Sequence, residues 1–223
     1  MKKNRTAKGS LLSLKAGVAV NAVPQKAVME FSTLSEEEFK HAKDAVEKEC
    51  GVRLERSGNT VTVIGVSAHA STPHLGKNAG LAALSFAVKL PSLSAEDKEA
   101  FEAILKLFPY GVTDGSGLGI KMNDEESGDL TCTLDLFAVD DKEMSFTFDS
   151  RVPICGNKEN CEDVARKSCE AKGFVFETNG MIPPHHVPKD SDFIKALLSC
   201  YEKVTGEKGE CIAIGGGTYV HEV

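Results

Sequence analysis

Hydrophobic and polar residues follow two periods along this chain, a period of two that is typical of strands and a period near 3.6 that is typical of helices. In the first part, three segments favour strands: residues 26–31, 52–55 and 60–64. Ser35 begins a Ser-Glu-Glu-Glu capping box, which predicts a helix start, and Gly51 marks the expected helix end. The apolar stripe of this helix comprises Phe39, Ala42 and Val46. With a hairpin turn expected at residues 57–59, this part follows a split β-α-β pattern.

The middle of the chain predicts two helices and then a second β-β-α-β unit. One helix should run to about Leu90, and Ser94 should open the next. Two segments alternate as half-buried strands: residues 131–139 and 143–148. Asn160 is expected to cap another helix, which ends at Gly173 before a strand at residues 174–177. This alternation of strands and helices indicates an α/β protein rather than an all-helical or all-β one.

A domain boundary is expected near residue 181. Three prolines within residues 183–188 cannot sustain a helix or a central strand. Beyond them, Asp190 or Ser191 should cap a helix that ends before Gly206, and residues 211–214 resemble a short buried strand. The apolar face of this helix comprises Phe193, Leu197, Cys200, Tyr201 and Val204. We therefore expect two parts, residues 1–181 and residues 182–223.

Composition, net charge and cysteine spacing limit the partners and the location that can be expected for this protein. With 41% hydrophobic residues the chain can bury a core, and a formal net charge of -7 argues against a nucleic-acid partner. No apolar run is long enough to cross a bilayer, and the basic first residues lack the apolar core of a signal peptide, so we expect a cytoplasmic protein with no membrane partner. Seven cysteines without a Cys-x-x-Cys pair are expected to be reduced, and none is assigned a catalytic role.

His69 is the residue that most directly suggests chemistry. It lies in the glycine-, serine- and alanine-rich segment of residues 65–79, between a predicted strand and a predicted helix. The small neighbours of His69 would let a ligand approach its ring closely. The alternative interpretation is a histidine whose hydrogen bonds are satisfied inside an ordinary turn.

Four segments, in the same order along the chain, resemble those of the metallodipeptidases of the PepV and Sapep type, within the aminoacylase and carnosinase superfamily. They are residues 17–24 (GVAVNAVP), 65–79 (GVSAHASTPHLGKNA), 148–153 (FDSRVP) and 214–219 (IGGGTY). The resemblance spans nearly the whole chain. It implies that residues 1–181 form a lid of two ferredoxin-like halves with an antiparallel sheet, and that residues 182–223 form a helix-strand fragment of the catalytic domain.

The resemblance also implies roles for particular residues. His69 and Asn21 would donate hydrogen bonds to the negative oxygen that develops when water attacks a peptide carbonyl. Arg151 would hold the free carboxylate of a dipeptide, and the glycine loop would complete that grip: Gly215, Gly216, Gly217 and Thr218. Taken without the resemblance, Asn21 is a turn residue before a proline, Arg151 is a solvated charge, and the glycines are a flexible linker.

The metal ligands of that family cannot be identified in this sequence. Complete enzymes of this type hold two divalent metal ions, Zn or Mn, but this chain has no His-x-Asp motif, and Glu125-Glu126 lies in a polar stretch that predicts a solvated loop. His185, His186 and His221 lack the spacing of a zinc site. No metal is therefore expected in this chain alone.

We therefore expect a part of a metal-dependent dipeptidase that is inactive by itself, with a dipeptide as the substrate. Its partner would be either a missing catalytic half or a second copy in a homodimer. The alternative is a non-catalytic peptide-binding or dimerisation module, because such domains pair through exposed sheet edges. A nucleotide-binding module is disfavoured, since the glycine loop lacks the following lysine of a P-loop.

Overall fold

A seven-stranded antiparallel sheet forms the centre of the computed structural model, which describes residues 1–6 and 9–216. The strands lie in the order β1-β9-β8-β2-β3-β5-β4, and each neighbouring pair is antiparallel. Their bounds are β1 Lys2–Asn4, β2 Leu11–Ala16, β3 Lys26–Phe31, β4 Arg53–Ser57, β5 Thr60–Ile64, β8 Thr131–Val139 and β9 Glu143–Arg151. A small separate hairpin pairs β6 (Asn123–Asp124) with β7 (Gly128–Asp129). The mixed α/β class and the antiparallel sheet of the sequence-based prediction are thus confirmed.

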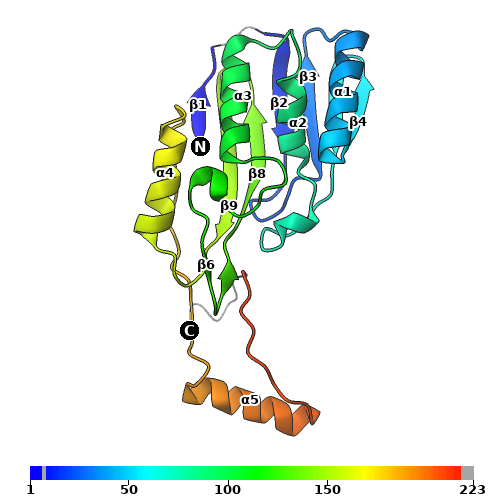
Figure 1. Cartoon of the computed structure of the whole chain (residues 1–223). Helices are drawn as coiled ribbons and strands as arrows, with labels where there is room; N and C mark the ends of the chain where they lie inside the picture. Colours follow the sequence, from blue (N-terminus) through cyan, green and yellow to red (C-terminus); the bar gives the residue numbers. More distant parts are fainter. Residues whose placement is uncertain (7–8, 217–223) are drawn as a thin grey trace.

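The helices cover one face of this sheet (Figure 1). They are α1 (Glu36–Cys50), α2 (Ala79–Ala87), α3 (Ala95–Leu107) and α4 (Asp163–Glu170), whereas α5 (Asp192–Thr205) lies apart from the sheet. Short 3-10 helices occupy Pro73–Leu75 and Ser116–Leu118, and a π-helical turn at Lys158–Glu162 precedes α4. The molecule therefore has two layers around one core, with an appended C-terminal helix.

Local sequence signals account for most of these boundaries. Ser35 caps α1 with the expected capping box, and Gly51 ends it in the left-handed conformation at φ 62°. Ser94 and Ser191 likewise cap α3 and α5 through their side chains. These predictions are confirmed because each depends on contacts within one turn of the chain.

Several predictions of helices and strands were wrong. Residues 174–177 form no strand: Val175 alone pairs, with Lys2 of β1. The polar segment β1 pairs with β9 and ends the sheet on that side, with Val175 beside it. Neither β1 nor β2 was predicted from the sequence. Residues 211–214 form no strand and are exposed. Helix α2 ends at Ala87 rather than near Leu90, and Asn157 rather than Asn160 makes the cap before α4.

The core lies between the sheet and helices α1 to α4. Helix α2 is buried almost all round because it lies between α1 and α3 and against the centre of the sheet. Its Phe86 meets the rings of Phe31 and Phe39 edge-on, at centroid distances of 6.4 and 6.0 Å. Near the β1 edge, Phe146 makes similar contacts with Phe137 and Phe174. One continuous apolar cluster therefore extends across the sheet from the β4 side to the β1 side.

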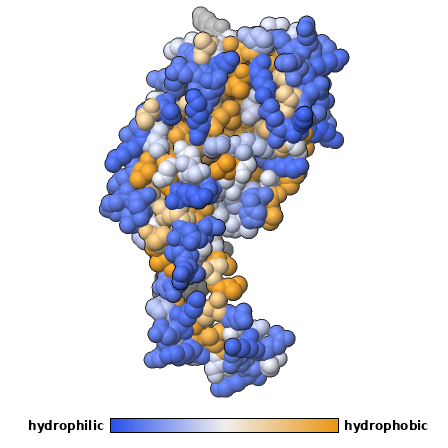
Figure 2. Space-filling model, viewed as in Figure 1, coloured by the Kyte–Doolittle hydropathy of each residue, from blue (hydrophilic) through white to orange (hydrophobic). Residues whose placement is uncertain are grey.

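Helix α5 buries none of its residues. Its apolar face is open to solvent, with Phe193 exposed by 62% and Val204 by 86%. Figure 2 shows hydrophobic residues at the surface in this lower part of the molecule. Among the helices that the structure describes, none is long and apolar enough to cross a membrane.

A buried ion pair joins the N-terminal segment to α3. Arg5 Nε and Nη2 donate to the two carboxylate oxygens of Asp97, both at 2.8 Å. Arg5 Nη2 also donates to the Leu11 carbonyl, and Nη1 donates to the Asp140 carbonyl. The side chains of Arg5 and Asp97 are 2% and 0% exposed. The pair ties the segment before β2 to the helical layer.

We predict that Asp97→Ala lowers the free energy of unfolding by about 3–5 kcal/mol, because it leaves the Arg5 charge buried without its counter-ion. Chemical denaturation measures this change. Glu99→Ala, on the exposed side of the same helix, is the matched control and should alter stability by less than about 0.5 kcal/mol. Equal effects of the two substitutions would contradict the prediction.

Candidate functional site

One end of the sheet gathers the predicted site residues. In an antiparallel sheet, the C-terminal end of one strand lies beside the N-terminal end of the next. The ends of β2, β5 and β9 and the beginnings of β3 and β8 therefore meet at one side. The loop of residues 17–25 and the loop of residues 65–78, which we call the His69 loop, both leave the sheet there.

The His69 loop is held by its own backbone at both ends. Val66 and Lys77 exchange two backbone hydrogen bonds, of 3.0 and 2.8 Å, and so close the loop at its base. Asn78 caps α2 by accepting from the Leu81 amide, and its Nδ2 donates to the carbonyl of Leu134 on β8 at 2.8 Å. The loop is therefore fixed both to the helix and to the sheet.

The structure brings Asn21 and His69 together. Their segments run antiparallel, with Ala22 bridged to His69, and the Ala70 amide donates to the Asn21 carbonyl at 3.0 Å. Both residues lie at the surface of the molecule. The Asn21 side chain makes no hydrogen bond within the described residues, so its amide group is available to a ligand.

Ser71 contacts the ring of His69. The Ser71 backbone N–H donates to Nδ1 at 3.1 Å, and the Ser71 Oγ lies 2.8 Å from the same nitrogen. The other ring nitrogen, Nε2, makes no hydrogen bond to any residue that the structure describes. His69 thus presents one free nitrogen from a loop whose backbone is fixed.

Thr131 joins the His69 loop to Arg151. Its Oγ1 donates to the carbonyl of Ala70 at 2.8 Å, and in the register of the sheet Thr131 lies directly opposite Arg151. The C-terminal segment returns to the same place: a Cβ added to Gly215 would lie 3.3 Å from Ser71 Cβ and 3.5 Å from Arg151 Cβ. Residues far apart in the sequence therefore meet at this end of the sheet.

Arg151 is oriented by Asp149, two residues earlier on the same face of β9. Its Nε and Nη2 donate to the two oxygens of Asp149, both at 2.7 Å. This side-on pairing leaves both N–H groups of Nη1 and one of Nη2 without a partner in residues 1–6 and 9–216. A second carboxylate can bind at that remaining edge with both oxygens.

Asp135 is a buried carboxylate close enough to Asp149 and Arg151 to interact with their charges, and it was not singled out from the sequence. It lies in a β-bulge of β8, is 0% exposed, and neither carboxylate oxygen has a hydrogen-bond partner in the described chain. Burial raises the pKa of Asp135 to about 8, and the negative charge of Asp149 contributes to the same rise. The available signal was an acidic residue between Leu134 and Leu136, in a stretch of β8 that is otherwise apolar from residue 134 to residue 139.

The bulge around Asp135 also explains Gly17, which opens the loop of residues 17–25. Gly17 has a φ of 82°, and a Cβ at this position would lie 1.8 Å from the carbonyl oxygen of Asp135. Any other residue would clash with the strand and adopt a strained backbone. This close approach holds the loop of residues 17–25, which contains Asn21, against β8.

The described residues do not fit a metal centre. None of their His, Cys, Asp and Glu side chains forms a group of three that could hold an ion. Asp124 accepts hydrogen bonds from its own hairpin and from Cys155, and His186 Nε2 lies 3.1 Å from Glu126. Glu125 and Glu126 are exposed at the hairpin tip, as the sequence predicts for a solvated loop.

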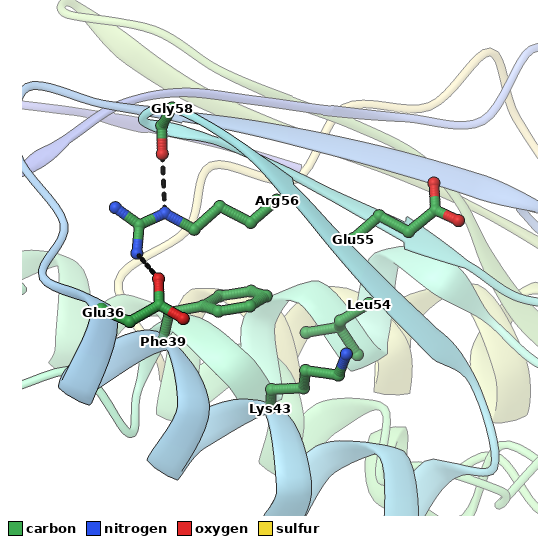
Figure 3. A pocket seen from close by; sticks show the side chains of 7 residues that line it. All are labelled: Glu36, Phe39, Lys43, Leu54, Glu55, Arg56 and Gly58. Atoms are coloured by element: carbon green, nitrogen blue, oxygen red, sulfur yellow. Dashed lines mark hydrogen bonds and ion pairs between the residues drawn. The ribbon is translucent and has the colours of Figure 1, made fainter.

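Neither of two surface hollows contains His69, Asn21 or Arg151. An open groove lies between α1 and the edge strand β4, where Arg56 donates to the Gly58 carbonyl and pairs with Glu36 above the ring of Phe39 (Figure 3). A smaller, mostly apolar hollow of about 90 Å³ lies beside Pro73 and His74 of the His69 loop. Of the candidate site residues, His69 and Asn21 are exposed and Arg151 is half-buried.

The structure thus brings together most of the residues predicted from the sequence. His69, Asn21, Arg151 and Gly215 lie at one end of the sheet, and Gly216 follows directly. Gly217, Thr218 and His221 lie outside the described residues. Arg151 is the last residue of β9, whereas the sequence analysis places it just after the strand.

We predict a specific pH dependence from Asp135. Between its ordinary pKa of 3.8 and about 8, the folded chain holds a proton that the unfolded chain has released, so the free energy of unfolding falls as pH rises. Asp135→Asn removes this dependence, and its stability advantage over the natural chain should grow by at least about 1 kcal/mol between about pH 5 and 8. Thermal or chemical unfolding across this range measures it. Asp141→Asn, in an exposed turn, is the control, and parallel pH profiles for natural chain and Asp135→Asn would refute the assignment.

Comparison with known proteins adds a distant relationship. No protein-family model matches the sequence. The chain is 27% identical over 220 residues to proteins named "putative dipeptidase" from Staphylococcus aureus strains USA300, NCTC 8325 and Mu50. The alignment covers 96% of this chain but 46% of each relative, so the chain spans about half the length of the curated relatives it matches. This similarity supports a relationship to a dipeptidase family.

Proposed function

We propose that this chain is the substrate-binding and oxyanion-stabilising part of a metal-dependent dipeptidase of the PepV and Sapep type. In this proposal residues 1–181 are the lid, and residues 182–223 belong to the catalytic domain. The observation that carries it is the convergence of His69, Asn21, Arg151 and Gly215 at one end of the sheet. The similarity to proteins named dipeptidases supports the same class of reaction.

Arg151 defines one end of a bound dipeptide. Its free guanidinium edge matches the two oxygens of a C-terminal carboxylate, and Asp149 prevents the guanidinium from turning away. Gly215 lies close enough to Arg151 for its backbone to contact the same carboxylate, because it has no side chain in the way. Such a clamp selects short peptides, since the carboxylate must lie near the bond that is cleaved.

His69 and Asn21 define the place where the scissile bond lies. When water attacks the peptide carbon, the carbonyl oxygen becomes negative, and donors fixed in advance stabilise that charge. His69 Nε2 and the Asn21 side-chain amide lie at the surface and are unpartnered within the described chain, so both can donate there. Loss of one such donor typically costs about a hundred- to a thousandfold in rate.

The metal ions of the complete enzyme must be held by other residues, because the described ones do not form a suitable ligand set. We propose that a catalytic half supplies them and that it covers the exposed apolar face of α5, including Phe193 and Val204. Burial of such side chains contributes about 25 cal/mol for each Å² removed from water. The chain would then act only in combination with that half.

We predict that alanyl-alanine binds the purified chain at least about tenfold more tightly than its C-terminal amide, because only the free carboxylate pairs with Arg151. Isothermal titration calorimetry compares the two ligands. Arg151→Met should abolish the difference, whereas Arg53→Met, which removes an exposed arginine of β4, should preserve it. Equal binding of peptide and amide by the natural chain would exclude the carboxylate clamp.

We further predict no hydrolysis of a dipeptide panel by the purified chain with added manganese or zinc, with chelator as the control. Turnover requires metal ligands that the described residues do not provide. Chelator-sensitive turnover that follows the protein through purification would show a metal site within this chain, and His185, His186 and His221 would be substituted first. Peptide binding without any turnover in the presence of a catalytic half would instead favour the non-catalytic binding module.

A further inference from the structure

The hydrogen bond between the Ser71 backbone N–H and His69 Nδ1 can run in only one direction. A backbone N–H only donates, so His69 Nδ1, which lies 3.1 Å from the Ser71 nitrogen, must accept. A neutral imidazole whose Nδ1 accepts carries its proton on Nε2. The backbone geometry of the loop therefore selects one of the two tautomers of this ring.

We propose that Ser71 is a positioning residue that holds His69 in the Nε2–H form and so reserves that N–H for a ligand oxygen, a role that rests on the proposed function. The opposite tautomer would place the N–H of Nδ1 against the N–H of Ser71. The doubly protonated ring would create the same conflict. Only the neutral Nε2–H ring satisfies the contact and still has a donor to offer.

The backbone N–H of Ser71, rather than its hydroxyl, makes this selection. Ser71 Oγ lies 2.8 Å from Nδ1, but a hydroxyl can either donate or accept and therefore fits both tautomers. The hydroxyl strengthens the contact without deciding its direction. Replacing the side chain should accordingly leave the tautomer unchanged, whereas removing the N–H should not.

The surrounding contacts keep the Ser71 amide in place. The preceding residue, Ala70, is fixed on both sides, since its N–H donates to the Asn21 carbonyl and its own carbonyl accepts from Thr131 Oγ1. The next residue, Thr72, donates its N–H to the His69 carbonyl at 2.9 Å. The peptide that carries the selecting N–H is thus held by neighbours from two other parts of the chain.

Nuclear magnetic resonance of the nitrogen-15-labelled chain tests the inference directly, at a pH where the histidines are neutral. We expect the His69 spectrum of an Nε2–H ring and a scalar coupling across the hydrogen bond between the Ser71 amide nitrogen and His69 Nδ1. The His69→Asn spectrum assigns the signals. Ser71→Ala should retain both features, and Ser71→Pro, which has no N–H, should lose the coupling. An Nδ1–H ring or a missing coupling in the natural chain would overturn the inference, whether or not the proline variant folds.

A binding experiment distinguishes failure of the proposed function from failure of this inference. A phosphinic analogue of alanyl-alanine carries a tetrahedral oxyanion, and calorimetry should show about tenfold or more weaker binding to His69→Ala, with Ser71→Ala within about threefold of the natural chain. An Nε2–H ring with the coupling present supports the inference even where the analogue fails to bind. That failure would count against the proposed function alone.

Discussion

The register between β8 and β9 is the constraint on which the candidate site depends. It places Thr131 opposite Arg151 and inserts Asp135 as an extra residue in the strand. Thr131 then reaches the His69 loop through one hydrogen bond to Ala70, so the same strand pair positions both His69 and Arg151. A shift of one residue would turn Arg151 to the opposite face of the sheet and separate the two groups, because side chains alternate between the faces.

Buried and half-buried charged groups occur in three arrangements in this structure. Arg5 and Asp97 are buried as a complete pair with further hydrogen bonds to backbone carbonyls, which stabilises the join between the N-terminal segment and α3. Asp135 is buried without such partners, which favours its protonated form at neutral pH. Asp149 pairs with the half-buried Arg151 and leaves one edge of its guanidinium without a partner in the described residues. A buried carboxylate without hydrogen-bond partners, such as that of Asp135, is uncommon in proteins and often accompanies a functional site.

Two surfaces of the described part of the chain are important for the proposed function. One is the end of the sheet that carries His69 and Arg151, and the other is the exposed apolar face of α5. The relatives that match this chain are about twice as long, as the 46% coverage shows. Both surfaces are accounted for by the proposed function, in which a catalytic half provides the metal ions, covers α5 and closes over the substrate.

The sequence by itself determined the elements whose signals are local. Capping serines and glycines determined both ends of α1 and α5 and the start of α3, and alternating residues determined β3, β5 and β8. The small-residue segment around His69 made this residue a candidate, whereas Arg151 became one only through the resemblance of its flanking residues to a known family. Only the tertiary structure decided which segments pair. It placed β1 beside β9 at the edge of the sheet, reduced the strand expected at residues 174–177 to one bridge from Val175 to Lys2, left residues 211–214 exposed, and buried Asp135. These outcomes depend on contacts between residues far apart in the chain, for which the period of a single segment carries no information.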